Sequence, residues 1–167
     1  MDRKIFETSI AGKPIKVEFN PIAKQANGSV LVSLGATTVL ATAVMSPVPK
    51  ETVEYFPLTV DYEEKYYAAG RILGSRFMRR EGRPSEEAIL VGRLIDRTIR
   101  PLFDHRVRHD VQVTISTLSL DEENSPDVVA ILAASLAILT SDLPWDGPVA
   151  AVRMSLVNDT LIMNPTD

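Results

Sequence analysis

The chain has 167 residues, 45% of them hydrophobic, and no cysteine. This length and apolar content suffice for one compact domain with a hydrophobic core, and the missing thiols exclude disulfides, thiolate zinc sites and cysteine nucleophiles. The formal net charge is −4, yet ten of the twelve arginines lie between Arg71 and Arg108. No apolar stretch is long enough to span a membrane and no signal or transit pattern is present, so we expect a cytoplasmic protein without membrane contact.

Alternating polarity predicts β-strands throughout the first third of the chain. We expect strands at residues 5–10, 15–19, 30–34, 37–45 and 58–62. The first two are predicted to form a hairpin around Ala11 and Gly12, and the next two to be joined by a short turn at Gly35. Pro57 stands at the start of the last strand, where a missing hydrogen-bond donor is tolerated. The polar residues 47–54 predict a loop.

A helix is predicted between Ser85 and Pro101. Ser85 is suited to cap its N-terminus, two glutamates follow in the first turn, and Pro101 ends it. The 3.6-residue period places one set of side chains on a packing face: Val91, Leu94, Ile95 and Thr98. The opposite face is expected to carry a row of guanidinium groups: Arg93, Arg97 and Arg100.

The remaining elements are predicted to be a strand, a second helix and a hairpin. They cover residues 111–120, 128–139, and 149–157 with 160–163. The second helix is apolar on every side, which is typical of a buried helix, and Ser125 and Pro126 are suited to its start. This order of elements favours an α+β fold with a mixed sheet covered by helices.

The segment before the first helix predicts a site for an anionic strand. It is too polar and too rich in glycine to be buried, and it carries Phe77, Met78, Arg79 and Arg80. A single-stranded nucleic acid is bound by apolar groups against its bases and cations along its backbone. Arginine suits this role because its planar fork matches two phosphate oxygens at once.

Less specific interpretations stay open for these residues. An arginine row on a helix is most often a solvated face, which Glu86 and Asp96 could neutralise, and Phe77 could be a core anchor. We predict no metal site. Arginines lie between His105 and His109 and would repel a dication. The carboxylates near the last of the first five strands are more often solvated than bound to magnesium: Asp61, Glu63 and Glu64.

Long words in a fixed order carry a family resemblance: DYEEKYYAAGRI, FMRREGRPSE, LIDRTIRPLF, NSPDVVA and DGPVAAVR. They resemble the first ribonuclease PH-like core of the bacterial polynucleotide phosphorylases, collinearly over essentially the whole chain. The resemblance implies a ribonuclease PH-like core of the ribosomal protein S5 domain 2-like type. Residues 1–140 would be the first ribonuclease PH-like domain. Residues 141–167 would be the start of the second half of that core, incomplete at the C-terminus.

The resemblance also implies an activity, that of a polyribonucleotide nucleotidyltransferase. Such an enzyme shortens single-stranded RNA from 3′ to 5′ by phosphorolysis and releases nucleoside diphosphates. Catalysis in the family lies in a second core, so neither catalytic residues nor metal ligands are expected in this chain, and alone it is expected to be inactive. Inorganic phosphate would be the co-substrate, with Mg2+ in the other core. A homotrimer that degrades mRNA with partners of an RNA-degradation complex is implied as well.

Within this chain, the resemblance implies RNA binding by eight residues: Phe77, Met78, Arg79, Arg80, Arg83, Arg93, Arg97 and Arg100. For the last four, the resemblance leaves open whether each faces the RNA channel or has a structural role. The first four match a Phe-Phe-Arg-Arg motif of the family except at Met78, where a flexible thioether replaces a flat ring. Two alternatives stay open. The chain could be a non-catalytic RNA-binding or trimer-assembly module, or it could belong to an enzyme that trims tRNA 3′ ends as ribonuclease PH does.

Overall fold

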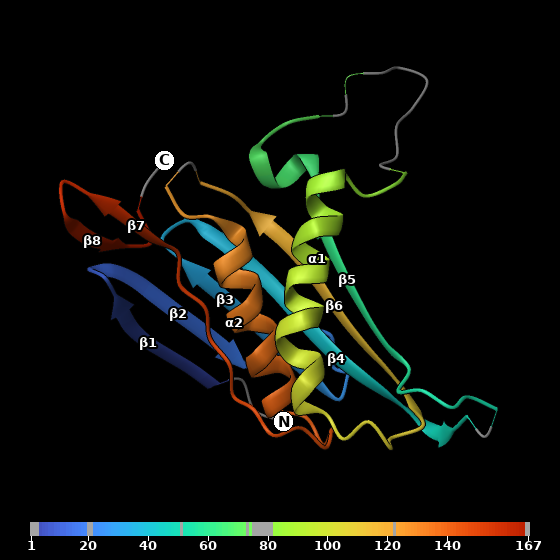
Figure 1. Cartoon of the computed structure of the whole chain (residues 1–167). Coiled ribbons are helices and arrows are strands. Elements are labelled where there is room, and N and C mark those ends of the chain that lie inside the picture. The colour runs from blue at the N-terminus through green and yellow to red at the C-terminus, as the bar shows by residue number, and fades with distance from the viewer. Residues whose placement is uncertain are drawn as a thin grey trace.

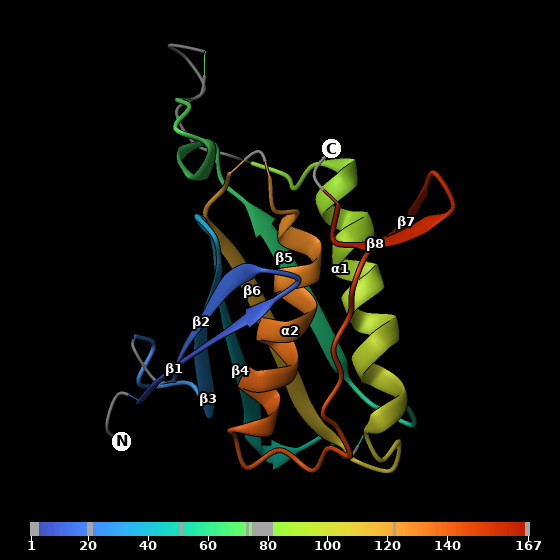
Figure 2. The same ribbon diagram turned by 90° about the vertical axis from the view of Figure 1, so that its left-hand side faces the viewer.

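The computed structural model describes residues 4–19, 22–50, 52–72, 74, 82–121 and 123–165. A six-stranded sheet carries both long helices on one face (Figures 1 and 2). The strands are β1 (Lys4–Ile10), β2 (Lys13–Phe19), β3 (Gly28–Leu34), β4 (Thr37–Pro49), β5 (Leu58–Glu64) and β6 (His109–Ser119). Their order across the sheet is β1-β2-β3-β4-β6-β5, and only β5 and β6 are parallel. The parallel pair arises because the chain returns from β5 to β6 through a helix.

The core lies between the central strands and the helix α2 (Pro126–Leu139). Every second residue of β6 from Val111 to Thr117 is buried, as the alternation predicts. α2 meets the sheet through small side chains, among them Ala130 and Ala137, both fully buried. The predicted buried helix is therefore confirmed. Its short side chains let its backbone approach the sheet closely.

The helix α1 (Glu86–Ile99) covers the β5 side of the same face. Ser85 caps it as predicted, because its Oγ accepts a hydrogen bond of 3.0 Å from the Ala88 amide. Its buried residues are Ala88, Gly92, Ile95 and Ile99. The predicted packing face is wrong at Leu94, which is 47% exposed. The helix docks through the small residues Ala88 and Gly92, which turns Leu94 away from the sheet.

Two predicted boundaries are also wrong. β4 continues through residues 47–49, which were expected to be a loop, because Pro49 pairs with His109 and the His109 ring bonds to the Ser46 carbonyl at 2.7 Å. The C-terminal hairpin contains only β7 (Met154–Val157) and β8 (Thr160–Met163). Residues 149–153 form no strand, since this segment contacts α2 instead: the Val149 amide donates to Ser135 Oγ at 2.9 Å.

Two short 3₁₀ turns complete the described structure, η1 (Tyr66–Ala69) after β5 and η2 (Arg100–Leu102) after α1. None of the helices in the described ranges is long and apolar enough to cross a membrane.

Candidate nucleic-acid interface

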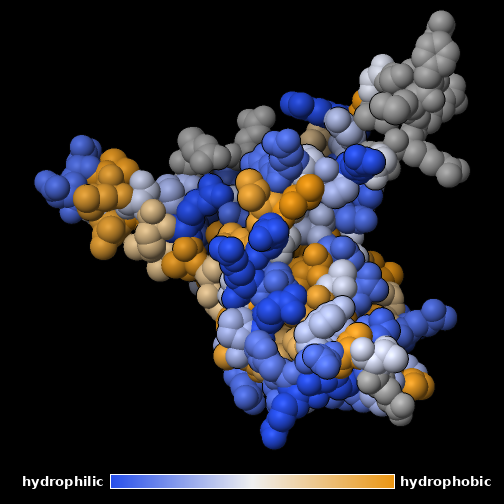
Figure 3. Space-filling model, turned by 45° about the vertical axis from the view of Figure 1, so that its right-hand side comes forward, coloured by the Kyte–Doolittle hydropathy of each residue, from blue (hydrophilic) through white to orange (hydrophobic). Residues whose placement is uncertain are grey.

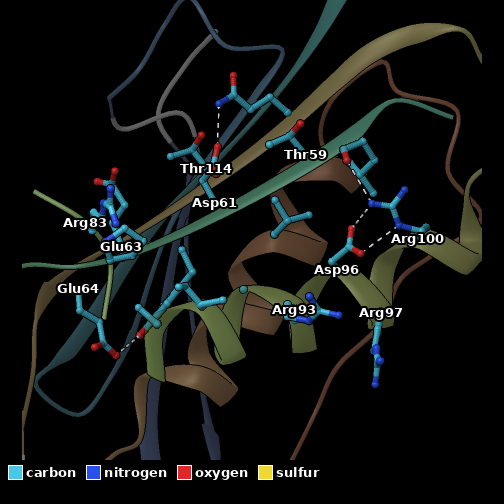
Figure 4. A pocket seen from close by; sticks show the side chains of 18 of the residues that line it. Thr59, Asp61, Glu63, Glu64, Arg83, Arg93, Asp96, Arg97, Arg100 and Thr114 are labelled. Atoms are coloured by element: carbon cyan, nitrogen blue, oxygen red, sulfur yellow. Dashed lines mark hydrogen bonds and ion pairs between the residues drawn. The ribbon is translucent and has the colours of Figure 1, made fainter. Parts of the chain in front are cut away.

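A groove of about 650 Å³ runs between the edge strand β5 and α1 (Figure 4). It brings together the described half of the predicted RNA-binding set: Arg83, Arg93, Arg97 and Arg100. The other half lies outside the described residues: Phe77, Met78, Arg79 and Arg80. The groove exists because β5 is the last strand of the sheet and α1, which connects it to β6, lies beside its free edge.

The α1 wall of the groove carries exposed cations. Arg93 and Arg97 are one helical turn apart and project from α1, and Arg83 lies just before the helix (Figure 4). Among the described residues, neither Arg93 nor Arg97 has an acidic partner within ion-pair distance. Exposed guanidinium groups without a carboxylate partner are available to bind phosphate oxygens.

Arg100 has a different environment, although it lines the same groove. Its guanidinium grips Asp96 with two bonds, Nη2 to Oδ1 at 2.6 Å and Nε to Oδ2 at 3.0 Å. Nη2 also donates to the Leu58 carbonyl at 3.1 Å. Arg100 therefore ties the end of α1 to the start of β5 and covers part of the edge of the sheet. The spacing of Asp96 and Arg100, four residues apart on one helix, is the sequence signal for this pair.

The β5 wall carries carboxylates, but local donors occupy them. Asp61 accepts a bond of 2.9 Å from Gln112 Nε2, and Glu63 lies 3.1 Å from the Lys65 ammonium. Glu64 accepts from the Tyr62 hydroxyl at 3.0 Å. Asp61 and Glu64 keep their negative charge, since their donors are neutral, but each of the three carboxylates has its partner on the β5 side and none of them forms an ion pair with Arg93 or Arg97.

Tyr62 is a structural donor between this wall and the core. Burial raises the pKa of its hydroxyl well above the ordinary value. The hydroxyl accepts from Thr117 Oγ1 at 3.1 Å and donates to Glu64. It therefore stays protonated and holds the carboxylate of Glu64, one of the residues that line the groove.

The described residues contain no group of three His, Cys, Asp or Glu side chains placed to hold a metal ion.

A family model for the 3′ exoribonuclease family, domain 1, matches residues 11–144. The chain belongs to the 3′ exoribonuclease family. A polyribonucleotide nucleotidyltransferase from Exiguobacterium sibiricum is 54% identical over 164 residues, which are 98% of this chain and 22% of that protein. One from Thermus thermophilus is 52% identical over 161 residues, 96% of this chain and 22% of its own length. The resemblance to polynucleotide phosphorylases is therefore confirmed, and this family member spans about a fifth of such relatives.

Solved structures confirm the ribonuclease PH-like α+β fold of this family member. A chain of the Archaeoglobus fulgidus exosome, solved with RNA bound to the active site, superposes with a TM-score of 0.70 at 22% identity, covering 91% of this chain and 66% of that one. Rice Rrp46 gives a TM-score of 0.68 at 16% identity, covering 99% and 70%. Identities this low establish the shared fold and nothing more.

Proposed function

We propose that this chain is the first ribonuclease PH-like core of a polyribonucleotide nucleotidyltransferase and that it grips and guides RNA. The whole enzyme would shorten single-stranded RNA from its 3′ end with inorganic phosphate and release nucleoside diphosphates. The names of the relatives at 52–54% identity support the activity. The groove between β5 and α1 supports the guiding role.

One observation carries the proposal: Arg93 and Arg97 stand on one wall of an open groove, while the acids of the other wall are bound to their own neighbours. Phosphoryl transfer depends mainly on positioning and on charge stabilisation. Holding the strand lets its terminal phosphodiester reach a phosphate ion and Mg2+ in another core. The loop residues Phe77, Met78, Arg79 and Arg80 extend this grip in the proposal.

The proposal includes the setting of the enzyme. It would act on mRNA in the cytoplasm, as a homotrimer and with partners of an RNA-degradation complex. Part of the arginine set has a structural role within the chain, as Arg100 does, and contributes to RNA binding only through the position of α1.

The test is the salt dependence of RNA binding. A variant carrying Arg93→Ala and Arg97→Ala is compared with the unchanged protein by fluorescence anisotropy of labelled poly(A) over a series of salt concentrations. The slope of log K against log salt is expected to become shallower by about 0.7 for each phosphate that the variant no longer neutralises. Arg106→Ala is the matched control, because that exposed guanidinium pairs with Asp104 beyond the far end of α1. An unchanged slope in the double variant would remove the guiding role.

A second function, assembly with other subunits, is favoured by one feature of α1. Leu90 and Leu94 are 66% and 47% exposed and lie one helical turn apart. Figure 3 shows orange apolar side chains among blue hydrophilic ones on the side of the molecule that carries α1 and β5. In this alternative the chain is a non-catalytic module that binds neighbouring subunits through α1.

A further inference from the structure

The turn η1, directly after β5, presents a tyrosine ring to solvent. Tyr67 is 59% exposed. Within the described part of the chain its hydroxyl makes no hydrogen bond and no aromatic ring stacks on it. A large flat side chain left in water is a candidate binding surface when its backbone is rigid.

The backbone of η1 is held firmly. The Ala68 side chain is buried, and the Ala68 carbonyl accepts a hydrogen bond of 2.9 Å from the Leu120 amide. Gly70 closes the turn in the left-handed region, with φ of 65°, and its amide donates to the Tyr67 carbonyl at 3.0 Å. One hydrogen bond thus ties the turn to the residue after β6, and another closes the turn itself. The backbone that carries the Tyr67 ring is therefore held in place.

The turn continues the groove described above. Glu64 and Lys65 line the groove and immediately precede η1. In Figure 1 the green turn η1 lies near the end of β5 and the start of α1. Arg83, which lines the groove, precedes α1 by three residues. Tyr67 thus follows the groove-lining residue Lys65 by two positions in the chain.

We propose that Tyr67 is a stacking platform for a base of single-stranded RNA whose phosphates run along the α1 wall. The inference rests on the proposed RNA-guiding function and adds a subsite to it. Every base has a π-face, so a tyrosine ring accepts any of them, and the hydroxyl stays in water. The guanidinium groups that line the groove favour a polyanion and the exposed ring favours flat uncharged faces, and a single-stranded nucleic acid has both.

Two substitutions separate the ring from the hydroxyl. Tyr67→Ala is expected to raise the Kd of the purified protein for a labelled oligoadenylate about five-fold to about a hundred-fold, the range measured for losing one stacked base. Tyr67→Phe keeps the ring and is expected to leave the Kd within about two-fold. Tyr55→Ala is the matched control, because Tyr55 is 68% exposed but precedes β5 at its opposite end. Its Kd is expected to be unchanged.

An abasic oligonucleotide of the same length supplies the decisive comparison. It keeps the phosphates and lacks the bases, so Tyr67→Ala is expected to leave its Kd unchanged. The stacking proposal is overturned if Tyr67→Ala and the unchanged protein have equal Kd values for oligoadenylate. It is also overturned if Tyr67→Ala and Tyr67→Phe raise that Kd equally. If binding of RNA to the unchanged protein shows no salt dependence, the guiding function itself fails. If RNA binding of the unchanged protein depends on salt as expected but Tyr67→Ala does not change the Kd, only the stacking proposal fails and the guiding function stands.

Discussion

Asp121 is the residue on which the turn between β3 and β4 depends. Its Oδ2 accepts from the Ala36 amide at 2.8 Å and from Asn124 Nδ2 at 2.9 Å. Its Oδ1 accepts from the amides of Glu123 and Asn124 at 3.0 and 2.6 Å. Burial raises the pKa of this carboxyl, but these hydrogen bonds outweigh burial and lower it to about 2. One ionised side chain thus joins the hairpin turn to the segment that begins α2.

Replacing Asp121 is expected to destabilise the protein in a pH-dependent way. Hydrogen bonds to a charged group are worth about 1.5–3 kcal/mol, so Asp121→Ala should lower the free energy of unfolding by about 2 kcal/mol near neutral pH. The folded-state pKa is below the ordinary 3.8, so this stability is present above about pH 4 and is lost as the pH falls toward about 2. Urea unfolding at both ends of this window measures it.

Asp146→Ala is the control for that experiment, since Asp146 is exposed and no described group bonds to its carboxylate. It is expected to change the unfolding free energy little at either pH. A gap between Asp121→Ala and the unchanged protein that stays constant across the window would show that the carboxylate charge is not what stabilises the turn.

At the scale of elements, both helices dock on the sheet where side chains are small. A Cβ added to Gly28 of β3 would overlap the Ala137 carbonyl oxygen of α2. Gly92 of α1 lies against β5, but an added Cβ would meet its nearest atom, Tyr62 Cβ, at 3.6 Å, which is ordinary contact. The two glycines therefore serve different purposes, although each lies at a contact between a helix and the sheet.

Alanine at these two glycines is expected to have opposite effects. Gly28→Ala forces β3 and α2 apart and should cost about 1–3 kcal/mol or more of unfolding free energy, as overpacking does. Gly92→Ala removes a poor helix former without a clash, so it should be neutral or stabilise the protein by up to about 1 kcal/mol. The denaturation midpoints of both variants and the unchanged protein measure these effects. A similar loss of stability in both variants would contradict this account of how the helices dock.

Short sequence patterns correctly predict several helices and strands of this fold. They do not predict contacts between segments that are distant in the chain. The Ser85 cap, the alternation of β6 and the apolar helix α2 are each encoded within a few residues, and the structure confirms them. The predicted packing face fails at Leu94 because the contact of Gly92 with β5 sets the face by which α1 docks. The β5 residues in that contact lie about thirty positions before Gly92 in the sequence.

The groove could not be predicted from short sequence patterns either, because its two walls come from different parts of the chain. Its two walls become neighbours only because β5 is the edge strand and pairs in parallel with β6. The sequence named four of its arginines through a family resemblance and left open which of them are structural. The bonds of Arg100 to Asp96 and Leu58 answer that question for one of the four.

At the scale of the whole molecule, the proposed RNA binding requires a chain of net charge −4 to attract a polyanion through local fields. The Debye length is about 8 Å at physiological ionic strength, so acids elsewhere on the surface are largely screened from the groove. Within the groove, Arg93 and Arg97 have no carboxylate partner among the described residues, so their guanidinium groups can pair with an approaching phosphate. Binding to RNA is thus compatible with an acidic protein, and it should weaken steeply with salt.

Binding without turnover is the expected behaviour of this chain alone. This expectation rests on the proposed function, which assigns catalysis to another core, and the chain spans 22% of a relative that carries the enzyme name. With poly(A), phosphate and Mg2+ present, the chain should retain labelled RNA on a filter and release no nucleoside diphosphate detectable by chromatography. Circular dichroism establishes that the chain is folded, and the variant with alanine at Arg93 and Arg97 should retain less RNA. Release of diphosphate would place catalysis within this core, whereas a folded chain that retains no RNA would favour the assembly module.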